Sequence, residues 1–399
     1  MSARIAVTGI GCLCAQGGNG PDIMEAIDHR PVLPRPPSTF TTPLREYPVF
    51  DVERTAERFL DVPLDPERFT RCVRMAAQAL EEALRAADLA PGDLKGRRVA
   101  IVMGTTAGVT LSDAEYCKDY YAGRSPATGP YARFLRSNPS LALARILDIP
   151  AIPFTVVNAC ASSTDAVGLG RTLLQAGMAD VAVTGGTDEV CEVNHTGFVS
   201  LLIHSKGPCR PFDLHRDGLN LGSGAAVLIL EREAEAQRRG ARPEVFLTGY
   251  GTFADGHHMT APHPEGRGLR KAVAKALAES GIGPGDLAFV NAHGTATKDN
   301  DLVEGSVFAD LLAPGTPVVS TKGYTGHTLG AAGAIEAAIS LYALKRGMLM
   351  KSAGFEVFDA SCGISPSREP LALDKDYFMS TSLGFGGSNA ALVFSRGRS

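Results

Sequence analysis

The tetrapeptide PGDL occurs twice in this chain, and each copy lies in the same local pattern. The first copy, at residues 91–94, follows a segment with apolar residues at helical spacing (residues 72–87) and precedes the apolar run VAIVM. The second copy, at residues 284–287, follows a similar segment (residues 269–280) and leads into LAFVNA. Apolar residues three and four positions apart predict helices, and short apolar runs bounded by glycine predict strands.

A second correspondence extends this repeat. Apolar pairs at 156–157 and 318–319 each precede a loop of small residues and a predicted helix. Helix–turn–strand units in this order are typical of α/β proteins. The recurrence therefore predicts two α/β halves of similar topology, residues 1–240 and 241–399. Residues 30–48, which are rich in proline, predict an irregular segment on the surface.

Composition argues against several broad classes of protein. The chain of 399 residues has a formal net charge of −4, which is unlike a general nucleic-acid binder. No apolar run approaches the length of a membrane span, and we expect no signal peptide. The eight cysteines are scattered without a CxxC pair or metal-ligand spacing, which favours a reducing cytoplasm and predicts no metal site. Neither GIGCLC nor GFGGSN completes the GxGxxG motif of dinucleotide-binding proteins.

Four loops contain residues with reactive or aromatic side chains. Each loop follows an apolar run that predicts a β-strand. They are NACASST around Cys160, NAHGTAT around His293, STKGYTGHTLGAAG around Lys322 and His327, and SLGFGGSNAA around Phe385. Each residue alone has a plainer interpretation, since a buried cysteine packs as a small apolar group and a histidine often bonds within its own turn. Because strand ends in α/β proteins gather ligands and catalytic groups, the four loops together favour an active site.

These motifs resemble those of the β-ketoacyl-[acyl-carrier-protein] synthases, the condensing enzymes of fatty-acid and type II polyketide synthesis. The resemblance runs from RIAVTGIG near the start to SLGFGGSNAALVF near the end, and CRPFDLHRDGLNLGSGAA is similar to the family's RPFD–RDG–GEGAG segment. It implies a thiolase-like α/β fold in which two duplicated βαβαβαββ halves form a five-layer α-β-α-β-α core. It also implies that the chain catalyses a decarboxylative Claisen condensation.

The resemblance implies a role for each of these residues. Cys160 is the nucleophile that receives an acyl chain from carrier-protein phosphopantetheine, and we expect its place at a helix N-terminus to favour the thiolate. His293 and His327 flank the malonyl thioester and stabilise the enolate that forms when carbon dioxide leaves. Lys322 holds a positive charge beside the histidines, and Glu336 on the following helix is linked to this network.

Other implied roles concern the oxyanion and the pantetheine arm. The backbone N–H groups of Cys160 and Phe385 are expected to form the oxyanion hole. The Phe385 ring matches the family's gate at the acyl pocket. Thr295 and Thr297 match the threonines that hydrogen-bond the pantetheine arm.

Two acidic positions match the family, and two other positions depart from it. Asp301 and Glu304 match residues that tie down the following helix, which is a structural role. Ser223 stands where the family's GEG motif has glutamate, which leaves the role of that carboxylate in loop or interface order open. Ala107 takes the place of a bulky aliphatic residue in the gating loop. We expect this small side chain to leave a deeper channel for a long, polyene-type acyl chain.

The resemblance also implies partners. Substrates travel on carrier-protein phosphopantetheine, so no other cofactor is expected. Carrier proteins are acidic, and Arg68, Arg71 and Arg74 at helical spacing form a candidate docking patch, with an ordinary solvated face as the alternative. The motifs are closest to those of aryl-polyene ketosynthases, which often pair with a chain-length factor that lacks the cysteine. We expect a cytoplasmic homodimer, or a heterodimer in which this chain is the catalytic subunit.

Three alternatives have recognisable signatures. A degradative thiolase would carry a second catalytic cysteine near the C-terminus, but GFGGSN has none and Cys362 lies outside any such motif. An initiating condensing enzyme with a Cys–His–Asn set would lack the histidine of KGYTGHT, which is His327 here. The third alternative is a non-catalytic, pocket-shaping subunit, and the presence of Cys160 argues against it.

Overall fold

Ten strands form one sheet in the computed structural model, which describes residues 3–106 and 114–397. The strand order is β10-β9-β13-β14-β8-β1-β7-β6-β4-β5. The strands of this sheet are β1 (Ile5–Cys14), β4 (Val99–Gly104), β5 (Ala151–Val156), β6 (Val181–Asp188), β7 (Gly224–Arg232), β8 (Val245–Ala254), β9 (Leu287–Asn291), β10 (Val318–Val319), β13 (Tyr377–Gly384) and β14 (Ser388–Arg396). Two short ribbons lie outside it, β2 (Arg58–Phe59) with β3 (Val62–Pro63) and β11 (Met348–Leu349) with β12 (Leu371–Ala372).

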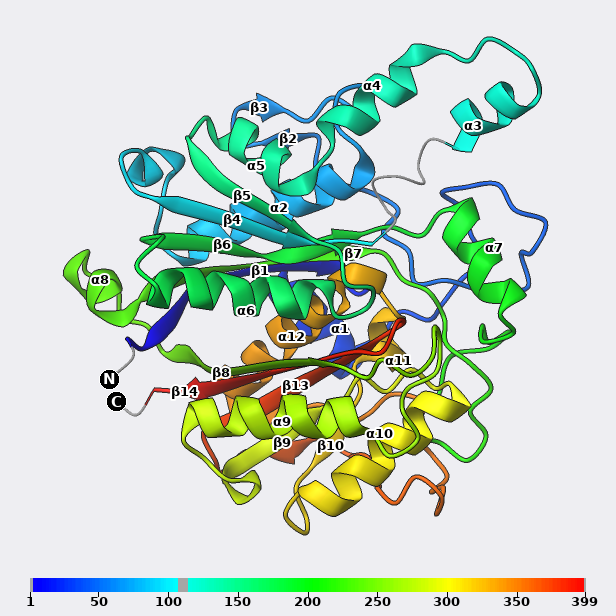
Figure 1. The fold of residues 1–399 in the computed structure, drawn as a ribbon, viewed down its shortest axis with the longest axis vertical. Helices are drawn as coiled ribbons and strands as arrows, with labels where there is room; N and C mark the ends of the chain where they lie inside the picture. The colour runs from blue at the N-terminus through cyan, green and yellow to red at the C-terminus, as the bar shows by residue number, and fades with distance from the viewer. Residues whose placement is uncertain (1–2, 107–113, 398–399) are drawn as a thin grey trace.

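Most strands of the sheet are separated along the chain by one or more helices (Figure 1). They are α1 (Gly20–His29), α2 (Arg71–Ala86), α3 (Ala114–Tyr121), α4 (Thr128–Arg136), α5 (Pro139–Leu147), α6 (Ser162–Gln175), α7 (Glu192–Ser200), α8 (Glu233–Arg238), α9 (Arg267–Ser280), α10 (Lys298–Leu311), α11 (Lys322–Thr325) and α12 (Ala332–Arg346). Helices α2 and α9 begin and end within two residues of the ranges that their apolar spacing predicts. The first PGDL copy forms a 3-10 turn, and the second forms one over Pro284–Asp286, directly before β9 begins at Leu287. Residues 30–48 contain neither a helix nor a named strand.

The predicted duplication is confirmed by the strand order. The first half runs β5-β4-β6-β7-β1 and the second runs β10-β9-β13-β14-β8, so each strand has a counterpart at the same place. In both halves three strands are parallel and the last two are antiparallel. The halves meet where β1 pairs with β8 over Ile5–Val7. The division at residues 240 and 241 stays a prediction.

Five layers result, in the order helix, sheet, helix, sheet, helix (Figure 1). Helices α2 and α5 cover the outer face of the first half-sheet, and α9 covers the outer face of the second. Helices α6 and α12 pack against each other between the half-sheets. Strands β4 and β9 are buried at every position, because helices cover both of their faces.

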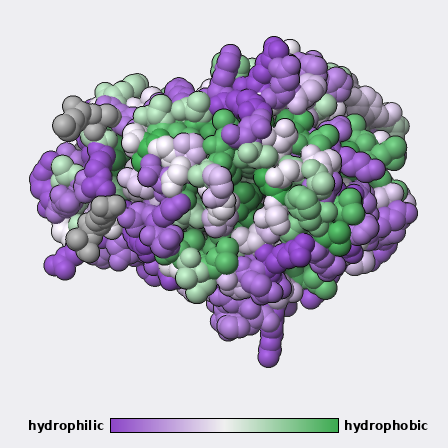
Figure 2. Space-filling view, turned by 90° about the horizontal axis from the view of Figure 1, so that it is seen from below, coloured by the Kyte–Doolittle hydropathy of each residue, from purple (hydrophilic) through white to green (hydrophobic). Residues whose placement is uncertain are grey.

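The surface is uneven in polarity. Figure 2 shows the lower face of the molecule, where several groups of apolar side chains lie among hydrophilic ones. Among the described residues, no helix combines the length and the apolarity that a membrane crossing requires.

Candidate active site

The structure brings the predicted loops together at strand ends. Cys160 lies between β5 and α6, and His293 follows β9. Lys322 begins α11 just after β10, and His327 follows the same short helix. Phe385 lies at the turn between β13 and β14. The parallel strands of both halves thus deliver their loops to one site, as expected for an α/β protein.

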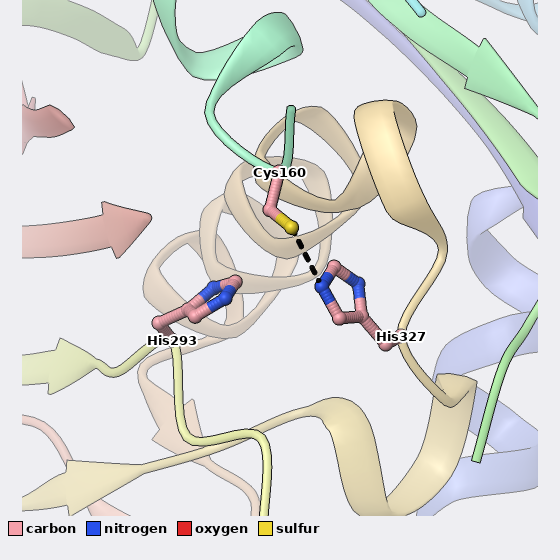
Figure 3. A group of neighbouring side chains, drawn as sticks. All are labelled: Cys160, His293 and His327. Carbon is pink, nitrogen blue, oxygen red and sulfur yellow. Dashed lines mark hydrogen bonds between the residues drawn. The ribbon is translucent and has the colours of Figure 1, made fainter. Parts of the chain in front are cut away.

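The cysteine and both histidines converge on one point (Figure 3). The ligand atoms of Cys160, His293 and His327 all lie within 4.8 Å of one another. The Cys160 Sγ is 3.0 Å from Nε2 of His327, and the two imidazole rings meet edge to face with centroids 5.2 Å apart. All three side chains are buried.

The partners of the two rings fix which nitrogen carries hydrogen. The Lys322 ammonium lies 3.1 Å from Nδ1 of His293, and the backbone N–H of Leu329 donates to Nδ1 of His327 at 3.1 Å. Both partners can only donate, so both Nδ1 atoms accept and each Nε2 carries hydrogen in a neutral ring. Burial lowers the pKa of both rings well below the usual value, with the Lys322 charge acting in the same direction, which keeps them neutral. Two N–H donors therefore face the space beside the cysteine sulfur.

This donor arrangement also bears on metal binding. A cysteine and two histidines at such spacing match the ligand types of a zinc site. A metal would need the Nε2 lone pairs, which requires hydrogen on both Nδ1 atoms. Those atoms already face the Lys322 ammonium and the Leu329 N–H. The surroundings therefore suit a pair of hydrogen-bond donors rather than a metal ion.

A buried ion pair lies beside His293. The Lys322 ammonium bonds the Glu336 carboxylate on α12 and also the carbonyl oxygen of His293. Lysine and glutamate are 1% and 2% exposed, so neither charge is stable there without the other. Burial raises the pKa of Glu336 to about 7, and the Lys322 charge opposes that rise. The predicted Lys–Glu–His network is present as a set of contacts.

The resting state of the nucleophile differs from the prediction. Burial raises the pKa of Cys160 to about 11, although Lys322 and the backbone N–H groups of Phe385 and Cys160 lower it. The expectation that the helix N-terminus favours the thiolate is wrong in net direction, because desolvation outweighs the terminus. The preceding Ala159 has φ 46°, a left-handed conformation that is strained for alanine and turns Cys160 into the cavity.

This protonation state predicts how alkylation depends on pH. The rate of Cys160 modification by iodoacetamide should rise about tenfold per pH unit between about pH 7 and 9.5, because only the thiolate reacts. Mass spectrometry of the Cys160 peptide measures it, and glutathione, whose rate levels off near about pH 9, is the reference. A plateau below about pH 7 would instead mean a thiolate–imidazolium pair.

A cavity of about 560 Å³ leads to the nucleophile. Cys160, both histidines and Phe385 line it, together with Thr295 and Thr297. The hydroxyl oxygens of the two threonines lie 2.8 Å apart. Leu201 and Leu202 are exposed and line the same cavity. The site is therefore reached through a partly apolar channel, and the role of the threonines stays a prediction.

One aromatic contact at this site could not be predicted from the sequence. Phe198 on α7 stacks on the predicted gate Phe385, with ring centroids 5.7 Å apart and planes 12° apart. Its ring also meets His327 edge-on at 6.5 Å. Phe198 carries no motif of its own, so only its place in the folded chain reveals it.

Asp301 and Glu304 hold the loop of His293. The two Glu304 carboxylate oxygens accept the backbone N–H groups of His293 and Gly294, both at 2.7 Å. Asp301 accepts the N–H groups of Thr295 and Ala296. Burial raises the pKa of Glu304 to about 7. The structural role expected of these carboxylates is confirmed, and it serves the loop before the helix.

The prediction that Arg68, Arg71 and Arg74 form one exposed docking patch is wrong. Arg68 is exposed but precedes α2, so it does not continue the helical spacing. Arg71 faces inward and pairs with Asp51 at 2.6 Å and with Glu189 at 3.7 Å. Arg74 is half-buried, and its Nε has no hydrogen-bond partner. The charge of Arg71 is thus already neutralised by carboxylates of the same chain.

The two departures from the family have different outcomes. The Ser223 hydroxyl bonds Asp51 at 2.5 Å and accepts the N–H of Val190 at 2.9 Å. The Asp51 carboxylate thus lies beside the position where the family has glutamate. Ala107 lies outside the described residues.

The duplicated fold and this site define a thiolase-like acyltransferase. The family profile described as "Beta-ketoacyl synthase, N-terminal domain" matches residues 2–236, and the "C-terminal domain" profile matches residues 245–356. The chain belongs to the β-ketoacyl synthase family, as its motifs predict.

Individual relatives support this family assignment. The chain is 32% identical over 420 aligned residues to 3-oxoacyl-[acyl-carrier-protein] synthase 2 of Staphylococcus aureus strain N315, with 98% of each chain covered. Its fold is similar to that of the ishigamide ketosynthase/chain length factor (TM-score 0.91, 28% identity, 100% of both chains). It is also similar to the ketosynthase ApeO in complex with its chain length factor ApeC from Xenorhabdus doucetiae (TM-score 0.83, 30% identity, 99% of this chain and 98% of that one). The degradative-thiolase and non-catalytic alternatives are not favoured.

Proposed function

We propose that this chain is a β-ketoacyl-[acyl-carrier-protein] synthase. One observation carries the proposal: a nucleophilic thiol and two imidazole N–H donors face the same buried space. The sulfur serves to hold an acyl chain, and the two donors serve to stabilise an oxyanion formed beside it. A synthase named in this way covers nearly the whole chain at 32% identity, which supports the assignment.

The first step loads the enzyme. The Cys160 sulfur attacks the thioester carbonyl of an acyl chain on carrier-protein phosphopantetheine. The oxyanion that forms is stabilised by the backbone N–H groups of Cys160 and Phe385. The bond to the phosphopantetheine sulfur breaks, and the proton of the thiol ends on that leaving sulfur. Thr295 and Thr297 are proposed to bind the arm.

The second step forms the carbon–carbon bond. Malonyl thioester loses carbon dioxide, and the electron pair of the broken bond becomes an enolate whose oxygen accepts from Nε2–H of His293 and His327. The enolate carbon attacks the acyl carbonyl on Cys160, the carbon–sulfur bond breaks, and the released sulfur takes a proton from water. No cofactor beyond carrier-protein phosphopantetheine is required, and we propose that the growing chain is of polyene type.

The test is reconstitution with purified carrier protein. Acyl-carrier protein should raise the mass of the Cys160 peptide by that of the acyl group, and malonyl-carrier protein should then release carbon dioxide and a β-ketoacyl product. Enzyme alkylated beforehand at Cys160 is the control. Absence of both the adduct and the product would overturn the proposal.

We also propose that a second subunit pairs along β5. This strand is the edge of the sheet, and Phe154 and Val157 are exposed there. An open edge strand with apolar side chains favours pairing with another chain, and the partner is proposed as a second copy or a chain-length-factor-like subunit. Light scattering should give a dimer that Phe154→Asp converts to monomer. A monomeric wild-type chain, alone and co-expressed with its partner, would contradict this.

A further inference from the structure

A chain of hydrogen bonds runs through Asn158 and joins the two halves of the molecule. The Asn158 amide donates to Asp165 on α6 at 2.5 Å, and its carbonyl accepts from the Ser388 hydroxyl at 2.5 Å. Asp165 also accepts from the Tyr250 hydroxyl on β8 at 2.8 Å. Two of the four residues belong to the first half, and Tyr250 and Ser388 belong to the second. The network therefore fixes one half against the other beside the site.

The two ends of this network lie next to the two proposed oxyanion donors. Asn158 precedes Cys160 by two residues, and Ser388 follows Phe385 by three. The backbones also touch directly, because a methyl group at Gly384 would lie 3.2 Å from the Asn158 oxygen and 3.2 Å from the Cys160 nitrogen. The Cys160 turn and the Phe385 turn are therefore packed together and tied by one side chain.

We propose that Asn158 is a positioning residue, which sets the spacing of the Cys160 and Phe385 N–H groups through its bond to Ser388. The inference rests on the proposed function. Asparagine suits the place because its amide donates to a carboxylate on one side and accepts from a hydroxyl on the other. Aspartate would face Asp165 with a second carboxylate, and an apolar residue would leave the Ser388 hydroxyl without this acceptor and Asp165 with one donor fewer.

The experiment compares two half-reactions of the same enzyme. Acyl transfer to Cys160 needs the backbone N–H pair, whereas malonyl decarboxylation needs the N–H groups of the histidines. Asn158→Ala should slow acyl transfer about tenfold or more, since small misplacement of reacting groups costs up to about 100-fold. Decarboxylation should change by less than about twofold, because the side-chain hydrogen bonds of Asn158 go to Asp165 and Ser388, which lie outside the histidine loops.

Variants at the other end of the bond separate positioning from general damage. Ser388→Ala should reproduce the loss in acyl transfer, Ser388→Thr should restore it by keeping the hydroxyl, and the double alanine variant should be no slower than Asn158→Ala. If Asn158→Ala does not fold, the comparison of Ser388→Ala with Ser388→Thr still tests the inference. Equal slowing of both half-reactions, or an unchanged rate of acyl transfer, would overturn the inference. Failure of the wild-type enzyme to take up an acyl group would instead overturn the proposed function.

Discussion

Cys160→Ala is expected to abolish condensation while malonyl decarboxylation continues. Condensation needs the sulfur as the point of attachment of the acyl chain, so its rate should fall by at least about 10⁴-fold. Decarboxylation depends on the N–H groups of His293 and His327, which the substitution leaves in place with their partners Lys322 and Leu329. Carbon dioxide release from malonyl-carrier protein and formation of β-ketoacyl product measure the two activities separately.

Alanine also removes the group that occupies the space between the donors. The Cys160 sulfur lies 3.0 Å from Nε2 of His327 in the resting site. Without it, Nε2–H is free to bond the malonyl carbonyl, and decarboxylation should stay at or above the wild-type rate. Cys117→Ala is the matched control, since that cysteine is exposed on α3 and should keep both activities. Condensation by Cys160→Ala within tenfold of wild type would show that another group holds the acyl chain.

Local sequence signals predict the helices and strand ends that position this site. Apolar spacing placed α2 and α9, and small residues after an apolar pair placed Cys160 between β5 and α6. These signals work because a strand end and a helix start are decided by residues close together in the chain. The motifs then identified which of the strand-end residues belong to one site.

Features that depend on distant contacts could not be predicted in this way. Helical spacing grouped Arg71 with Arg68, but Asp51, twenty residues earlier in an irregular segment, turns the guanidinium inward. The helix N-terminus indicated a thiolate at Cys160, whereas the pKa depends on burial, which only the assembled fold sets. Phe198 entered the site through its stacking on Phe385, a contact between the two halves.

Lys322→Met is expected to lower the rate of malonyl decarboxylation about 100-fold. The Cys160 thiol is expected to stay reactive. The ammonium lies 3.1 Å from Nδ1 of His293 and holds that atom as an acceptor. Without this partner the ring is free to carry its hydrogen on Nδ1, and one of the two N–H donors to the enolate is lost. Removal of one such donor typically costs about 10²–10³-fold in rate. Alkylation of Cys160 should persist.

Lys322→Met also lowers the stability of the fold, because Glu336 loses its buried partner. Breaking one side of such a pair costs about 3–5 kcal/mol. Burial already raises the pKa of Glu336 to about 7 with the lysine present, so without it the carboxyl keeps its proton in the folded state. The folded state then binds a proton that the unfolded chain releases near about pH 4.3, and stability of the variant should fall as pH rises from about 5 to 8.

The double variant Lys322→Met/Glu336→Gln separates the two effects. It lacks the carboxyl of Glu336, so thermal unfolding should regain stability at pH 8 and lose the part of the pH dependence between 5 and 8 that this carboxyl adds. Decarboxylation should nevertheless stay low, because nothing restores the donor to Nδ1 of His293. If the double variant recovers both stability and decarboxylation, the lysine serves only to neutralise Glu336 and plays no part in orienting the histidine.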